Sequence, residues 1–280
     1  MRILVTGSSG FIGQHLMRAL AESGYIHMLD LHNGYDLNKD WVVACVRRLA
    51  PEVVYHLAGI ADLDYCEKHP DEALRGNTFN FQNLLNGLQD VPVRAIVLAS
   101  SAAVYGFGPS PFCETDRRNP QSVYALTKYR AEDELEYFSR SHPTTHCIAA
   151  RIFNPVGTGD TSRRLVPNAV RGFLKNEEVK VGNLDVVRDF FHVDDAAEAL
   201  VHLTTATPSG FEVYNIGSGV GLTAHEALDL VGAHYVVWQP RVRAIDGNLI
   251  ANTDKVRATG WTPRRTLDQA IREMKEACEP

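Results

Sequence analysis

Residues 1–30 read MRILVTGSSGFIGQHLMRALAESGYIHMLD, and this stretch decides the fold. Apolar runs over residues 1–6 and 25–29 predict two short strands. Between them, three evenly spaced glycines are followed by apolar residues at helical spacing, and the second run ends on Asp30. Strand, glycine turn, helix, strand and acid come in the order of a dinucleotide-binding unit.

The glycine turn carries the chemistry expected of such a unit. Gly7, Gly10 and Gly13 allow the backbone to approach a pyrophosphate because they have no Cβ. The first amides of the following helix, those of Phe11 and Ile12, are expected to point at that anion. The alternative is a glycine-rich turn that binds nothing.

Asp30 stands about twenty residues beyond the turn, where a carboxylate can accept a hydrogen bond from a ribose 2′-hydroxyl. A carboxylate there repels a 2′-phosphate, and no arginine stands at positions 31–34 to bind one. We therefore expect NAD(H) in preference to NADP(H) as the cofactor. The alternative for Asp30 is a carboxylate that only serves the turn at the end of its strand.

The composition is typical of a soluble globular protein, with 280 residues, 45% of them hydrophobic, and a net charge of −6. No long basic run is present, so a nucleic-acid partner is not expected. No apolar stretch approaches a membrane span, and the N-terminus does not read as a signal peptide. Five scattered cysteines without a C-x-x-C pair predict neither a disulfide framework nor a metal site. We expect a cytoplasmic protein.

Strands and helices alternate along the first 150 residues. The apolar patterns predict strands over 53–57, 95–99 and 147–151, and helices over 41–49, 77–88 and 123–141. This alternation predicts an α/β fold with a doubly wound parallel sheet covered on both faces.

The pattern is looser after residue 154. It predicts strands over 179–181, 190–193 and 213–216, and helices over 163–174, from an Asp194 N-cap to about Thr205, after Thr223 and over 267–278. We predict a Rossmann domain over residues 1–155, joined by segments near 185–220. A smaller substrate-binding lobe, mainly residues 156–280, is expected to lie across the carboxyl edge of the sheet, where such folds bind ligands.

Tyr124 and Lys128 form a Tyr-x-x-x-Lys pair, which places both side chains on one face of the predicted helix 123–141. A neighbouring ammonium lowers the pKa of a phenol from about 10, which makes the phenol a usable acid or base at neutral pH. Ser101, at the end of the preceding strand, can hold the same carbonyl oxygen. The alternative is an exposed helix pair without function.

Five segments resemble the extended short-chain dehydrogenase/reductase family in their order and spacing. They are TGSSGFIG at 6–13, HLAG at 56–59, SSAAVYG at 100–106, YALTK at 124–128 and RIFNP at 151–155. The family comprises NAD-dependent nucleotide-sugar epimerases, dehydratases and reductases. The resemblance covers nearly the whole chain and implies an enzyme with a small-molecule nucleotide-sugar substrate.

The resemblance also implies roles for individual residues. A nicotinamide would exchange hydride with a sugar carbon, usually C4, while Tyr124 exchanges the proton. Lys128 would hold the nicotinamide ribose and tune Tyr124, and Ser101 would orient the sugar oxygen. The other positions that match cofactor-lining residues are Asp36, Leu37, Leu57, Ala58, Gly59 and Asn77. For Asp36, an N-cap of the following helix is an equally good interpretation.

Ala102 and Ala103 follow the catalytic hydroxyl, where 4,6-dehydratases of this family typically carry acids. Alanine cannot shuttle protons, so reduction and epimerisation remain. Residues 181–185 and 188–190 resemble the nucleotide-binding segment of the GDP-mannose dehydratase and GDP-4-keto-6-deoxymannose reductase branch. The candidate substrate-binding residues are Ser101, Ala102, Asn154, Val166, Asn183 and Arg188.

Several of these residues have structural alternatives. Arg188 would bind a diphosphate as a bidentate donor, or it would form a salt bridge with Asp185 or Asp189. Asn154 would contact the sugar or diphosphate, or hold a backbone turn. His192 alternates within its strand and is expected to be structural.

The leading hypothesis is an NAD(H)-dependent reductase of a GDP-linked 4-keto-6-deoxyhexose. The alternatives are a nucleotide-sugar C4 epimerase and a non-catalytic dinucleotide-binding sensor. By resemblance, the helices over 77–88 and 123–141 would pair two copies into a homodimer, although an apolar helix face is usually core.

Overall fold

The computed structural model describes residues 1–30, 34–238 and 247–277. Positions 31–33, which follow Asp30, and the predicted helix end at Cys278 lie outside the described residues. Among the described residues, no helix combines the length and the apolar character needed to cross a bilayer.

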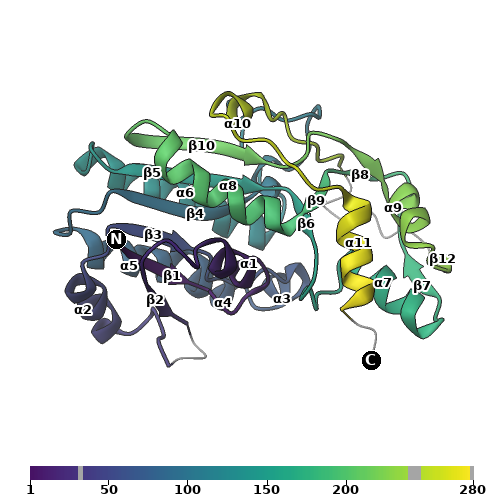
Figure 1. Ribbon diagram of the computed structural model, residues 1–280, viewed down its shortest axis with the longest axis horizontal. Coiled ribbons are helices and arrows are strands. Elements are labelled where there is room, and N and C mark those ends of the chain that lie inside the picture. The colour runs from purple at the N-terminus through teal and green to yellow at the C-terminus, as the bar shows by residue number, and fades with distance from the viewer. Residues whose placement is uncertain (31–33, 239–246, 278–280) are drawn as a thin grey trace.

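A six-stranded parallel sheet forms the centre of the molecule (Figure 1). Its strand order is β10-β5-β4-β3-β1-β2, and every neighbouring pair is parallel. The strands are β1 (Arg2–Thr6), β2 (Tyr25–Leu29), β3 (Val53–His56), β4 (Ala95–Ser101), β5 (His146–Ile152) and β10 (Gly210–Ile216). The predicted fold class is therefore confirmed, and the central strands are continuous apolar runs because helices cover both faces.

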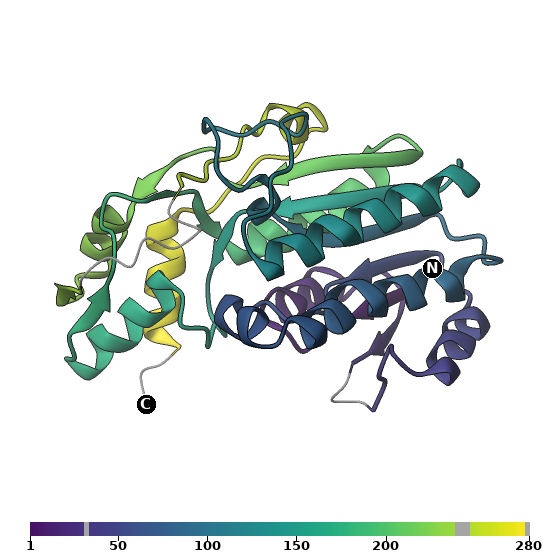
Figure 2. The same cartoon turned by 180° about the vertical axis from the view of Figure 1, so that it is seen from behind.

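Helices α1 (Phe11–Ala19) and α8 (Val193–Ala206) pack on one face of the sheet, and Leu16 and Leu200 bury their side chains there (Figure 1). The opposite face carries α2 (Asp40–Leu49), α5 (Asn80–Leu88) and α6 (Val123–Ser141), as Figure 2 shows. The bounds of α6 match the predicted helix, because Ser122 caps its N-terminus by accepting from the Ala125 amide.

A second lobe lies beyond the carboxyl ends of the strands (Figure 1). Its core is formed where α7, α9 and α11 pack together through residues such as Val170, Leu228 and Ile271. Its elements are α7 (Leu165–Lys175), β7 (Val179–Val181), β8 (Val187–Arg188), β11 (Leu222–Thr223), α9 (Ala224–Val231), β12 (Tyr235–Val237) and α11 (Leu267–Glu276). The paired strands β6 (Asn154–Val156) and β9 (Phe190–His192) carry the chain between the lobe and the sheet.

The free edge of β10 is covered by side chains. Lys255, in α10 (Asp254–Ala258), donates to the carbonyl oxygen of Val213 at 2.8 Å, and Glu114 accepts from the Asn215 amide at 2.9 Å. These contacts satisfy backbone groups that an open strand edge would expose. They also support the anchoring of the 106–120 loop by Glu114.

Two local predictions differ from the structure. The predicted continuous helix 77–88 is a π-helical turn, η2 (Arg75–Phe79), followed by α5, and it is preceded by the unpredicted short helices α3 (Leu63–Lys68) and α4 (Pro70–Leu74). Helices of five or six residues are too short to show a helical apolar period. The predicted Asp194 cap of α8 is wrong, because the cap lies two residues earlier, at His192, whose side chain accepts from the Asp194 amide.

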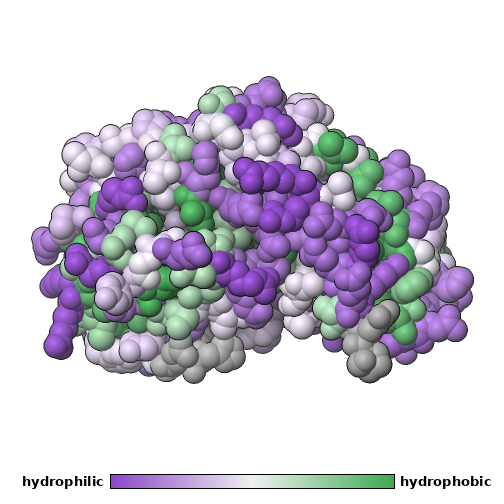
Figure 3. Space-filling model, in the orientation of Figure 1, coloured by the Kyte–Doolittle hydropathy of each residue, from purple (hydrophilic) through white to green (hydrophobic). Residues whose placement is uncertain are grey.

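Hydrophilic side chains cover the middle of the face seen in Figure 3, where α8 approaches the second lobe. His15, Asp194, Arg265 and Glu198 are the charged or polar residues that meet at this junction. The contact between body and lobe is therefore polar on this side.

Candidate active site

The glycine turn between β1 and α1 is too tightly packed for side chains. Gly7 has φ +76°, and a Cβ there would lie 2.5 Å from the Ala58 nitrogen. A Cβ at Gly13 would lie 2.0 Å from the Gly7 carbonyl oxygen. Helix α1 starts at an N-cap glycine without a side-chain cap and has no acid in its first turn. This amide-lined cradle at a positive helix end fits a dinucleotide pyrophosphate.

Asp30 holds the glycine turn in shape. Its buried carboxylate accepts from the backbone amides of Gly7, Ser8 and Ser9, and also from the Ser8 hydroxyl. Both oxygens thus serve the glycine turn after β1, and not the turn at the end of β2 that the sequence offered as the alternative. A further hydrogen bond to a ribose stays an expectation.

Ser101, Tyr124 and Lys128 meet where β4 ends against the first turns of α6. The Ser101 hydroxyl lies close enough to the Tyr124 phenol to lower its pKa. The Lys128 ammonium is 6% exposed, donates to the Ala99 carbonyl oxygen at 2.9 Å and lies 6.0 Å from the centre of the Tyr124 ring. The tertiary structure therefore assembles the three residues that the sequence singled out.

The pKa of Tyr124 is raised, whereas the Tyr-x-x-x-Lys pair predicted a lowered value. Burial raises it, and the Ser101 hydroxyl and the Arg164 charge offset only part of that effect. Burial also lowers the pKa of Lys128 to about 8, which weakens the ammonium as a source of positive charge. The phenol pKa is thus raised where the sequence predicted a lowered one, because desolvation outweighs the effects of Ser101 and Arg164.

Asn77 fixes the loop after β3 to α6. Its side chain accepts from the Ile60 amide at 2.6 Å and donates to the Ile60 carbonyl oxygen at 3.0 Å and to the Thr127 hydroxyl at 2.9 Å. The π-turn of η2 places this buried amide there, and π-turns often mark functional sites. Gly59 passes so close that a Cβ would lie 2.6 Å from the Asn77 Oδ1. Asn77 thus positions the segment beside Lys128.

A buried ion network lies behind Ser101 and Lys128. Glu132 follows Lys128 by one helical turn, is fully buried and accepts from the Ser100 hydroxyl at 2.5 Å. Arg151 donates to the two oxygens of the same carboxylate at 3.0 and 2.8 Å, and Arg118 donates at 3.2 Å. The bidentate pair holds β4, β5 and α6 together next to Ser101.

The profile of the NAD dependent epimerase/dehydratase family matches residues 3–217. The chain belongs to this family. Its members are enzymes, so this family member is an NAD-dependent nucleotide-sugar epimerase, dehydratase or reductase.

Similar proteins have more than one activity. A UDP-glucose 4-epimerase of Rhizobium leguminosarum bv. trifolii is 27% identical, and the alignment covers 96% of this chain and 95% of the relative. A GDP-6-deoxy-D-mannose reductase of Pseudomonas aeruginosa is 29% identical over 98% of this chain and 95% of its own length.

Solved structures share the whole fold. MoeE5 in complex with UDP-glucose and NAD has a TM-score of 0.90 at 28% identity, with 99% of this chain and 98% of that chain covered. RMD from Pseudomonas aeruginosa complexed with NADPH has a TM-score of 0.89 at 27% identity over the same shares.

The remaining cofactor candidates of this family member lie in and around the turns after β2 and β3. Leu37 is buried in the core, and Asp36 accepts from Asn38, while α2 starts later at an N-cap Lys39. The helix-capping alternative for Asp36 is therefore wrong. Leu57 and Ala58 are half-buried, beside the glycine turn.

The substrate candidates are spread over the carboxyl edge and the second lobe. Ala102 is buried after Ser101, and Asn154 donates to the Asp189 carbonyl oxygen at 3.3 Å, which is a structural contact. Val166 is buried in the lobe core, so its side chain does not line a surface. Asn183 is exposed and accepts from the Asp185 amide.

Arg188 lies between the lobe strands. It donates to the carbonyl oxygens of Val187 and Gly247 at 2.9 and 2.7 Å. The Asp189 carboxylate is turned away and accepts hydrogen bonds from the backbone amides of Ser218, Gly219 and Ala251. This geometry does not support the alternative of a salt bridge between Arg188 and Asp189.

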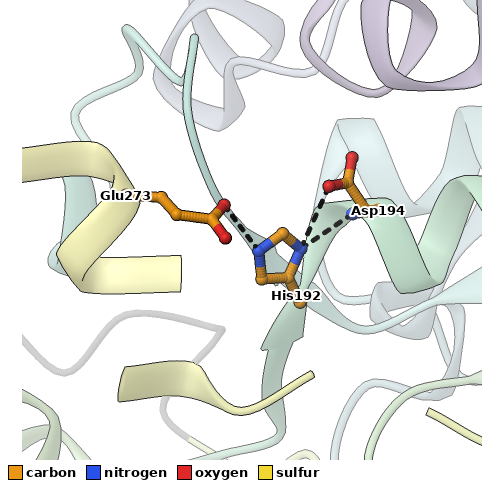
Figure 4. Close-up of side chains that lie close together, drawn as sticks. All are labelled: His192, Asp194 and Glu273. Carbon is orange, nitrogen blue, oxygen red and sulfur yellow. Dashed lines mark hydrogen bonds and ion pairs between the residues drawn. The ribbon is translucent and has the colours of Figure 1, made fainter. Parts of the chain in front are cut away.

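His192, Asp194 and Glu273 are metal-binding residue types that cluster between α8 and α11. Figure 4 shows the imidazole between the two carboxylates, with one ring nitrogen facing each side. Nδ1 accepts from the Asp194 amide at 3.1 Å, and Nε2 lies 3.0 Å from the Glu273 carboxylate. Both nitrogens are thus used to cap α8 and to tie it to α11, as the structural interpretation of His192 expects.

Sequence reasoning missed Glu132 and Arg164. Glu132 could have been found, because a charged residue eight positions after Tyr124 falls on the inward face of α6. The sequence gave no sign that Arg164 lies near the site, since Phe11 and Tyr124, which it approaches there, belong to distant segments.

Proposed function

We propose that the protein reduces the C4 carbonyl of a nucleotide-linked 4-keto sugar with a nicotinamide cofactor. The observation that carries this proposal is that Ser101, Tyr124 and Lys128 come together at the carboxyl edge of the sheet, with Lys128 buried beside the Tyr124 ring. Membership of the family supports an NAD-dependent reaction on a nucleotide sugar. That this reaction is a reduction is our proposal.

The glycine turn would hold the pyrophosphate of the dinucleotide, whose nicotinamide would supply the hydride for the new C4–H bond. Tyr124 donates its hydroxyl proton to the C4 oxygen, which becomes an alcohol. Because burial raises the pKa of Tyr124, the phenol stays protonated at neutral pH, the state required of a proton donor. Ser101 holds the C4 oxygen, and Lys128 would contact the nicotinamide ribose.

Dehydration is disfavoured by the residues after Ser101. Ala102 is buried, and Ala103 follows it in η3 (Ala102–Tyr105), so neither position offers a carboxyl group. Elimination of water needs such a proton-transfer group. A C4 epimerase is the second candidate, favoured by the similar UDP-glucose 4-epimerase.

We propose a GDP-linked substrate and NAD(H). The similar GDP-6-deoxy-D-mannose reductase supports the nucleotide. The Asp30 carboxylate supports NAD(H), because it would repel a 2′-phosphate, whereas the similar RMD structure holds NADPH.

The test supplies GDP-4-keto-6-deoxymannose with NADH or NADPH and follows absorbance loss of the reduced cofactor and product formation. We expect one equivalent of NADH oxidised per sugar, and a fall of about 10²–10⁴-fold in rate for Tyr124→Phe. Tyr137→Phe, an exposed tyrosine of the same helix, is the matched control.

Redox-neutral conversion of UDP-glucose would instead identify an epimerase. A Tyr124→Phe variant with wild-type turnover would contradict both catalytic functions and leave the sensor.

We further propose a homodimer through α6 and its neighbours. Tyr137 on α6 is 71% exposed and Phe79 on the adjoining η2 is 47% exposed. Light scattering should give twice the chain mass, and Tyr137→Arg should lower it; a monomeric wild type would refute the dimer.

A further inference from the structure

Residues 157–164 connect β6 to α7 and fold back over the start of α1. The His15 imidazole, in α1, donates from Nε2 to the Thr158 carbonyl oxygen at 2.9 Å. A Cβ at Gly159 would lie 3.6 Å from the Gln14 side chain, also in α1. The segment therefore contacts the helix whose N-terminus forms the glycine-turn cradle.

Arg164 is held at the end of this segment. Its Nη2 donates to the buried Asp160 carboxylate at 2.7 Å, and its Nε donates to the Ser162 hydroxyl at 3.1 Å. The guanidinium carbon lies 5.5 Å from the centre of the Phe11 ring. Two hydrogen bonds leave three of the five N–H donors of the guanidinium for other acceptors.

Phe11 is the first residue of α1, so the Arg164 cation lies beside the uncapped amide end of the helix. An anion at these amides would have the helix end on one side and the guanidinium on the other. The Arg164 charge also reaches the Tyr124 phenol, whose pKa it lowers. The cation therefore lies between the cradle and the catalytic residues.

We propose that Arg164 binds a phosphate group of the diphosphate ligand and closes the glycine-turn site from the side of the second lobe. This inference rests on the proposed function for the presence of such a ligand. The phosphate has two possible sources, the pyrophosphate of the dinucleotide and the diphosphate of the nucleotide sugar. Guanidinium donors suit either one, because they match phosphate oxygens in geometry and charge.

The test compares Arg164→Gln with Arg163→Gln, which removes the same charge from the exposed neighbouring side chain. One arm measures the Kd of NADH by fluorescence, and the other measures the Kd of GDP by calorimetry. Loss of a charge-assisted hydrogen bond should raise the Kd by about tenfold or more. Arg163→Gln should stay within about twofold of the wild type.

Weakening in the NADH arm identifies the cofactor phosphate, and weakening in the GDP arm identifies the substrate phosphate. Equal Kd values for the two variants in both arms would overturn the proposal. Neither arm requires turnover, so a failed activity assay and a failed Arg164 prediction are distinguishable.

Arg164→Gln leaves the buried Asp160 carboxylate without its ion partner, which could unfold the segment. The double variant Asp160→Asn/Arg164→Gln removes that charge as well. Its Kd should be raised by the same factor if Arg164 acts on the phosphate, and should return to the wild-type value if unpaired Asp160 caused the loss.

Discussion

Lys128 donates a hydrogen bond from its buried ammonium to the carbonyl oxygen of Ala99, 2.9 Å away. The contact joins α6 to the end of β4, and it directs the charge at the backbone more than at the Tyr124 ring. An ammonium buried in this way costs stability, because few groups replace its water.

Replacing Lys128 should therefore stabilise the chain. Burial lowers the pKa of Lys128 from 10.5 to about 8, which corresponds to a cost of roughly 3 kcal/mol at pH 7. Part of this is offset by the hydrogen bond that would be lost. We expect Lys128→Met to raise the free energy of unfolding by about 1–3 kcal/mol and to abolish turnover.

The stability cost of burying Lys128 should depend on pH. The cost is full below pH 8, where Lys128 is charged in both states, and it is relieved as pH rises from 8 to 10.5. The advantage of Lys128→Met in urea unfolding should shrink between pH 7 and pH 10. Exposed Lys68→Met is the control, and a pH-independent advantage would refute the explanation.

Glu132→Gln should strongly destabilise the chain. The substitution leaves buried Arg151 without its bidentate partner, and removing one member of a buried ion pair costs about 3–5 kcal/mol. Glu136→Gln breaks only an exposed pair with Arg140 and should cost less than about 0.5 kcal/mol. Chemical unfolding measures both, and equal losses would show that burial does not decide the effect.

Asp30→Ala should weaken NADH and NADPH binding together. The carboxylate accepts from the amides of Gly7, Ser8 and Ser9, so its loss releases the turn that both cofactors would need. A loss of about 2 kcal/mol corresponds to roughly thirtyfold in the Kd of NADH, and the Kd of NADPH should rise less because the repulsion of its 2′-phosphate is removed with the carboxylate. If Asp30 acted only against a 2′-phosphate, fluorescence titration would show tighter NADPH binding instead.

Asn77→Ala should reduce turnover more than cofactor affinity. The variant frees Ile60 and Thr127, so the loop beside Lys128 loses its tie to α6. We expect kcat to fall about tenfold with a smaller change in the Kd of NADH. Asn80→Ala, three residues later, has one long side-chain hydrogen bond and should retain kcat. A similar fall in both variants would point to a general weakening of the helix.

The elements that sequence predicted well are those with a local signal. The bounds of α6 agreed because Ser122 is a capping residue and the apolar face repeats along the helix. The interruption at Asn77 was missed because its side chain bonds to Ile60 and Thr127, which no spacing within the helix reveals. The helix after His192 was capped by an imidazole, a residue type that capping rules do not favour.

The residues of the candidate site also differ in how far the local sequence predicts them. The glycine turn and the Tyr124–Lys128 pair were predictable from the sequence because their geometry depends on residues that are close in the chain. The direction of the Tyr124 pKa shift was not predictable from the sequence, since it depends on how far the surrounding chain excludes water from the phenol. The orientation of the Asp189 carboxylate was likewise not predictable. It accepts from the Ser218 amide, which is distant in the chain, and the neighbouring Arg188 gives no sign of this contact.

The sequence by itself determined the dinucleotide-type turn, the parallel α/β class and the identity of the catalytic candidates, because short-range spacing and apolar periodicity encode them. Only the tertiary structure decided that β10 closes the sheet beside β5, that Glu132 meets Arg151 and that Arg164 reaches Phe11. Those contacts join segments far apart in the chain, and their partners are selected by the packing of the whole core.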